Sequence, residues 1–112
     1  MKVIFHIDEK KDWKKLLNNV NNMLTYYNSQ DEQIIIEILA NGNAVTSLTL
    51  DSEIENSIIK LLDNNVNVVA CNNSINEQGL NRQNILERIY IVASGVVELV
   101  EKQKQGFTYI KP

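Results

Sequence analysis

The sequence predicts an α/β fold in which helices cover both faces of a mainly parallel, five-stranded sheet. Short runs rich in β-branched residues alternate along the chain with longer segments whose apolar residues recur at helical spacing. The first run, residues 2–7, is apolar on nearly both faces, as strands are in the middle of a covered sheet. We therefore expect right-handed crossovers and a single domain over residues 1–112.

The N-terminal elements show the clearest periodicity. After the strand at 2–7, a helix is predicted from about Asp12, which can cap its N-terminus. A turn at 28–31 leads to a second strand at 34–40, which is rich in β-branched residues. The apolar stripe of the first helix comprises Trp13, Leu16, Leu17, Val20, Met23, Leu24 and Tyr27.

Turns and a second helix fill the middle of the chain. Asn41-Gly42-Asn43 ends the second strand, and a short helical segment is predicted at 44–48. The next helix is expected to begin at Asp51 or Ser52, and Ser52 and Glu55 have the spacing of a capping box. It should end at 64–65.

The C-terminal half continues the alternation. The third strand, 66–71, carries Cys71 at its C-terminal end, and a polar segment with one helical turn follows. A fourth strand is predicted at 89–92. Ser94 can cap the helix that follows it, and a short last strand is predicted at 107–110.

Composition excludes several function classes. The chain has 112 residues, a formal net charge of -3 and scattered lysines, which argues against nucleic acid as a partner. No apolar stretch approaches the roughly 20 residues of a membrane span, so no membrane association is expected. A single cysteine allows no internal disulfide and no Cys-rich metal site, and it fits the cytoplasm. Nucleotide-binding fingerprints and a nucleophile elbow are absent, and we expect no cofactor.

The candidate site lies where the strands end. Ligands of open parallel sheets bind beyond the carboxyl ends of the strands. A thiol there that faces a helical turn meets free N–H groups and the positive end of a dipole, which favour the thiolate. The alternative is that Cys71 is a small buried hydrophobe. Together the strand ends supply Cys71 as the catalytic candidate and, as binding candidates, Asn41, Gly42, Asn72, Asn73, Ser94 and Gly95.

Other candidates also have two interpretations. The backbone amides of Ser94-Gly95 can hold an anion or form an ordinary helix start. Asn41-Gly42-Asn43 can line a pocket or be a turn that requires positive φ. His6 is more simply a core or helix-facing histidine than a base for Cys71. The backbone amides of Asn72 and Asn73 are expected to stabilise a Cys71 thiolate.

Several segments resemble the DsrE/DsrF-like family, in the right order and over essentially the whole chain. They are the start KVIFHID, the segment LNNVxN from Leu17, the stretch VxACxNS around Cys71, and the endings SGVVEL and GFTYIKP. The resemblance implies a three-layer α/β/α sandwich of flavodoxin-like architecture with a five-stranded, mainly parallel sheet. It also implies a homo-oligomer, either a trimer or a hexamer.

The resemblance also suggests a function. Some members of the family carry sulfane sulfur as a cysteine persulfide between donor and acceptor proteins, and their cysteine corresponds to Cys71 in the A-C-x-N-[ST] pattern. The expectation is a sulfur-transfer protein; whether it is an enzyme stays open. The alternative is an oligomeric small-ligand-binding or scaffold protein with a structural Cys71. A nucleotide binder is suggested by fold analogy alone.

Overall fold

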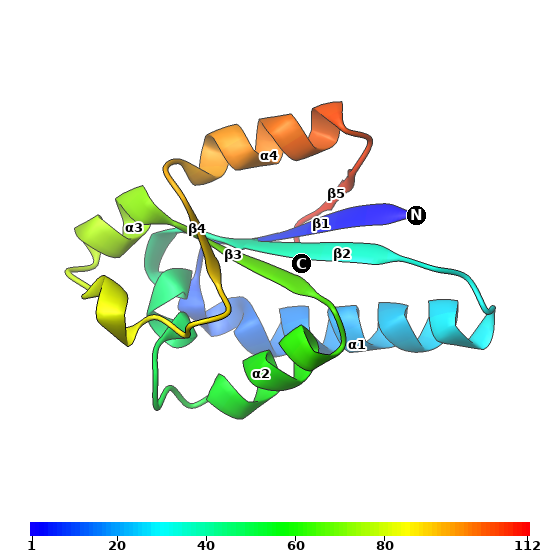
Figure 1. Cartoon of the computed structure of the whole chain (residues 1–112), viewed down its shortest axis with the longest axis horizontal. Coiled ribbons are helices and arrows are strands. Elements are labelled where there is room, and N and C mark those ends of the chain that lie inside the picture. Colours follow the sequence, from blue (N-terminus) through cyan, green and yellow to red (C-terminus); the bar gives the residue numbers. More distant parts are fainter.

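One five-stranded sheet organises the chain, and the computed structural model describes all residues, 1–112 (Figure 1). The strand order is β4-β3-β2-β1-β5, and every neighbouring pair is parallel. The sheet that was expected to be mainly parallel is therefore entirely so. The strands are β1 Lys2–Ile7, β2 Ile35–Ala40, β3 Asn67–Cys71, β4 Tyr90–Val92 and β5 Thr108–Ile110.

Helices on both faces complete three layers, as predicted. Helices α1 and α2 cover one face, α4 covers the other, and α3 lies at the carboxyl ends of the strands (Figure 1). The layering is flavodoxin-like, although the strand order differs from the flavodoxin order. No helix is long and apolar enough to cross a membrane. The helices are α1 Trp13–Ser29, α2 Glu55–Asp63, α3 Asn72–Glu77 and α4 Gly95–Lys104, with 3-10 turns at Lys10–Asp12, Gly42–Leu48 and Arg82–Asn84.

The two faces of the sheet bury very different amounts of apolar surface. Between α1, α2 and the face that they cover lies a hydrophobic cluster of 22 buried residues. The face under α4 has a cluster of four, namely Ile4, Leu39, Val69 and Leu99. Helix α4 is therefore attached to the sheet by few apolar contacts. Because hydrophobic stabilisation scales with the apolar area buried, polar contacts contribute a larger share to the placement of α4.

None of the three predicted caps forms a side-chain capping hydrogen bond, although Asp12 and Ser94 do stand at the N-cap positions of α1 and α4. Asp12 has helical φ and ψ inside a 3-10 turn, whereas a capping residue needs extended backbone. The Ser52 hydroxyl donates instead to the Ser47 carbonyl at 2.7 Å, and α2 begins at Glu55. Ser94 has the extended backbone of an N-cap, but its side chain makes no capping hydrogen bond.

Gly42 allows the turn after β2 to pass close to the end of β1. Its φ is +56°, in the region that favours glycine. A Cβ at this position would overlap the backbone carbonyl oxygen of Asp8. The prediction of a positive φ at this turn is confirmed, and close backbone approach is a second reason for glycine here.

Gly42→Ala should therefore destabilise the protein far more than Gly79→Ala. Gly79 also has a positive φ, of +67°, but its Cβ would meet nothing within 4 Å. We expect a loss of about 1 kcal/mol for Gly79→Ala and about 3 kcal/mol for Gly42→Ala, measured by urea unfolding. Equal losses in the two variants would show that the contact with Asp8 does not constrain the fold.

Candidate functional site

The ends of β2 and β3 meet the start of α4 at one place. A methyl group built on Gly95 would lie 3.2 Å from Cβ of Cys71 and 3.4 Å from Cβ of Asn41. The Gly95 backbone can approach this closely because it carries no side chain. Three of the predicted site residues, Asn41, Cys71 and Gly95, are thus in mutual proximity.

Cys71 is buried but surrounded by hydrogen-bond donors. It ends β3, is the N-cap of α3, and is 5% exposed. The Gly95 N–H donates to its Sγ at 3.3 Å. Burial alone raises the pKa of the Cys71 thiol, but the Ser74 hydroxyl and the backbone N–H groups of Ser74, Gly95 and Asn73 outweigh it, and the net result is a lowered pKa. The structure therefore combines burial with a stabilised thiolate.

Ser74 is the site residue that the sequence reasoning missed. It is buried, and its Oγ accepts a hydrogen bond from the Gly42 N–H at 2.8 Å. With that lone pair engaged, the hydroxyl proton remains free to donate to the sulfur of Cys71. The signal in the sequence was its place three residues after Cys71, the N3 position of a helix that Cys71 caps.

Of the two backbone amides predicted to stabilise the thiolate, those of Asn72 and Asn73, only one does so. The Asn73 amide is among the groups that lower the pKa of the thiol, and the Asn72 amide is not. Asn72 is the first residue of α3, and an N-cap side chain faces the amides of the second and third residues. The Oδ1 atom of the Asn72 side chain is buried without a hydrogen-bond partner.

His6 lies on the same face of the sheet as Cys71, but its ring nitrogens contact groups other than the thiol. Its Nε2 lies 3.0 Å from Asn41 Oδ1, and its Nδ1 lies 2.7 Å from the Tyr109 hydroxyl. Because a carboxamide oxygen only accepts, Nε2 is the donor to Asn41. The His6 ring is therefore hydrogen-bonded to Asn41 and does not form a Cys–His pair with Cys71. No group of three or more His, Cys, Asp or Glu side chains is arranged to hold a metal ion.

Comparison with known proteins agrees with the fold. A sequence model of the DsrE/DsrF-like family matches residues 2–112. The chain belongs to this family. Like the fold, membership of the DsrE/DsrF-like family is therefore as the sequence predicted. A search of curated proteins found no match.

Solved structures extend the comparison. The protein of unknown function MTH1491 from Methanobacterium thermoautotrophicum is 32% identical, with a TM-score of 0.90 over 99% of this chain and 98% of that one. The conserved protein of unknown function BT1422 from Bacteroides thetaiotaomicron is 20% identical (TM-score 0.74, covering 99% and 94%). The ychN protein from E. coli is 16% identical (TM-score 0.75, covering 100% of both). The last two show the DsrE-like fold alone.

Ser74→Ala tests the hydroxyl as a donor to the thiolate. We expect it to raise the pKa of Cys71, because one donor is lost while burial remains. The ultraviolet absorbance of the thiolate, followed against pH, measures the change in a chain with a single cysteine. Ser52→Ala is the control, since that hydroxyl donates to the Ser47 carbonyl instead. An unchanged pKa in Ser74→Ala would rule out the hydroxyl as a donor.

Proposed function

We propose that this protein is a thiol-reactive sulfur carrier of intracellular sulfur metabolism that holds sulfane sulfur as a persulfide on Cys71. The observation that supports this most is the convergence of the Ser74 hydroxyl and three backbone amides on one sulfur. Only the thiolate is a nucleophile, and donors that lower its pKa raise its population at neutral pH. Membership of the DsrE/DsrF-like family supports the same function.

The transfer requires two exchange steps without net oxidation. The Cys71 thiolate attacks the outer sulfur of a donor persulfide, a new S–S bond forms, and the donor leaves as its thiolate. An acceptor thiolate then attacks the outer sulfur on Cys71, takes it as a persulfide, and releases the Cys71 thiolate. The donor and the acceptor are partner proteins in this proposal, and no cofactor takes part.

Residues around Cys71 would shape the space for the outer sulfur. Gly95 brings its backbone close to the thiol, Gly42 donates to the Ser74 hydroxyl, and Ser94 precedes the donating amide. The oxygen of the Asn41 carboxamide is engaged by His6, which leaves its NH₂ group to donate to a second partner. An anionic persulfide beside Gly95 would be such a partner.

Burial of Cys71 controls access in this proposal. At 5% exposure, the residue offers a donor little surface for attack. The start of α4 lies directly against it. The Ser94–Gly95 segment must therefore move before sulfur is exchanged, and the transfer rate would follow that opening.

We further propose that the chain forms a homo-oligomer, a trimer or a hexamer. Large apolar side chains are exposed on and beside the helix that covers the thinner face of the sheet. Such side chains commonly pack against another subunit. They are Tyr90, Val96, Val97 and Val100.

A binding or scaffold protein with a structural cysteine is the second candidate. Burial of Cys71 favours it, since free cysteines often serve as small hydrophobes. A groove of about 390 Å³ on the opposite side of the sheet gives a small ligand a place to bind, within the size range of ligand sites. Phe5, Met23, Tyr26, Tyr27 and Ile110 are its apolar lining.

Incubation with a small-molecule persulfide donor separates the two candidates. We expect the mass of the folded protein to rise by one sulfur atom, and the added sulfur to be lost on treatment with a reducing thiol. Cys71→Ser should take up none. The same donor applied in urea is the control for access, because unfolding exposes the thiol. Uptake by the unfolded chain alone would contradict the carrier and favour the structural cysteine.

A further inference from the structure

Glu37 is a buried carboxyl group away from the candidate site. It lies in the middle of β2, on the face covered by α4, and is 4% exposed. Its neighbours in register are Ile4 on β1 and Asn67 on β3. Acidic side chains are almost never buried to this extent unless they are paired. The groups that pair with Glu37 come from α4.

Lys102 of α4 reaches Glu37, and Glu98 of the same helix lies against the same lysine. Lys102 Nζ lies 3.7 Å from Glu37 Oε1 and 4.0 Å from Glu98 Oε2. Lys2 lies over the same Phe107 ring as Lys102, but its ammonium group is engaged elsewhere. Its Nζ donates to the Gln105 carbonyl at 2.7 Å and lies over the Phe107 ring, 5.6 Å from the centroid. One lysine thus faces two carboxyl groups.

The charges and the hydrogen bonds of this cluster balance only if one proton is added. With both carboxyl groups ionised, Lys102 leaves a net charge of -1 in a largely buried place, which is costly. In addition, Glu37 Oε2 has no hydrogen-bond partner. Two carboxylates cannot supply the missing donor to each other, whereas a carboxyl and a carboxylate can. A single shared proton corrects both the charge and the hydrogen bonding.

We propose that Glu37 and Glu98 share one proton at neutral pH, and that this carboxyl pair, with Lys102, is a pH-sensitive attachment of α4 to the sheet. The pKa of Glu37 agrees: burial raises it first, the hydrogen bond and repulsion of Glu98 raise it further, Lys102 lowers it, and the result is about 8. Loss of the shared proton leaves the buried charge uncompensated. Helix α4, with its few apolar contacts, then loosens first.

The direction of the pH dependence follows from the raised pKa. Below the ordinary value of 4.5, folded and unfolded chains both hold the proton, and the contribution to stability is fully present. As pH rises from there to about 8, only the folded chain keeps it, so the folding equilibrium constant falls by up to about tenfold per pH unit. Above about 8 the contribution is lost.

The cluster also bears on Cys71, a consequence that rests on the proposed function. Helix α4 begins with Gly95, whose N–H donates to the Cys71 sulfur. Loosening of α4 would remove that donor and open the covered thiol at the same time. The shared proton would then regulate when the carrier is closed.

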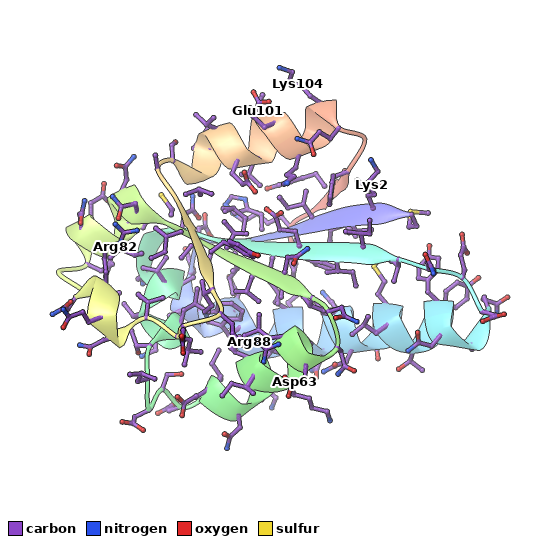
Figure 2. All side chains as sticks on the ribbon, viewed as in Figure 1. Lys2, Asp63, Arg82, Arg88, Glu101 and Lys104 are labelled. Atoms are coloured by element: carbon purple, nitrogen blue, oxygen red, sulfur yellow. The ribbon has the colours of Figure 1, made fainter.

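Glu37→Gln tests the shared proton, because glutamine keeps the size and supplies a permanent donor. We expect the stability of Glu37→Gln relative to the original protein to rise with pH between 5 and 8, by up to about tenfold in the folding constant per unit. Glu101→Gln on the same helix is the matched control, since Glu101 pairs with Lys104 on the outer side of α4 (Figure 2). Its curve should run parallel to that of the original protein.

A direct titration covers the case in which Glu37→Gln fails to fold. The carbon NMR signal of the Glu37 carboxyl, in the original sequence and in Glu98→Gln, should show a midpoint near 8 that falls when Glu98 is replaced. A midpoint near the ordinary 4.5 would overturn the proposal, as would parallel stability curves for Glu37→Gln and the control. Both measurements can be repeated in Cys71→Ser, so their outcome does not depend on whether the protein carries sulfur.

Discussion

The contact between the first residue of α4 and the end of β3 is the constraint on which the site depends. Gly95 donates its N–H to Cys71 Sγ at 3.3 Å, and it lies so close to Leu39, Cys71 and Asn41 that even a methyl group would be tight. The same contact fixes where α4 starts over the sheet. A glycine at this position therefore links the placement of a helix to the chemistry of a thiol.

That link matters because the sheet is covered unequally. The face under α1 and α2 holds most of the buried side chains, whereas α4 packs its own Leu99 on only three buried residues of the sheet. Polar groups supplement this thin packing at both ends of α4, with Gly95 against Cys71 at the start and Lys102 near Glu37 further along. A helix held in this way can move at low cost, which a covered thiol requires if it is to exchange sulfur.

The sequence predicted the fold but not these polar contacts. Alternation of β-branched runs with helical stripes depends on local pattern, so strand and helix positions were close to those observed. The side-chain caps at Asp12 and Ser52 failed because a capping side chain needs extended backbone and no competing partner. Ser94 does stand at the N-cap of α4, but its side chain makes no capping hydrogen bond.

Glu37 gave no local signal, and the signal for Ser74, its place three residues after Cys71, has meaning only once Cys71 is known to be the N-cap of α3. Glu37 is a single acid in an apolar strand, and its role becomes clear only from the packing of α4 against it. Ser74 is a single serine in a polar segment, and its role becomes clear only from its contact with Gly42.

Whether the site stabilises a thiolate is decided by the pKa of Cys71 in the folded protein, compared with its pKa in urea. The sulfur is buried, yet a hydroxyl and three amides favour its ionised form. Carbon NMR of the Cys71 Cβ against pH reports the ionisation without requiring a reagent to reach the thiol. We expect a lower midpoint in the folded protein than in the unfolded chain. A folded midpoint at or above the unfolded one would show that burial prevails and that Cys71 is an ordinary core residue.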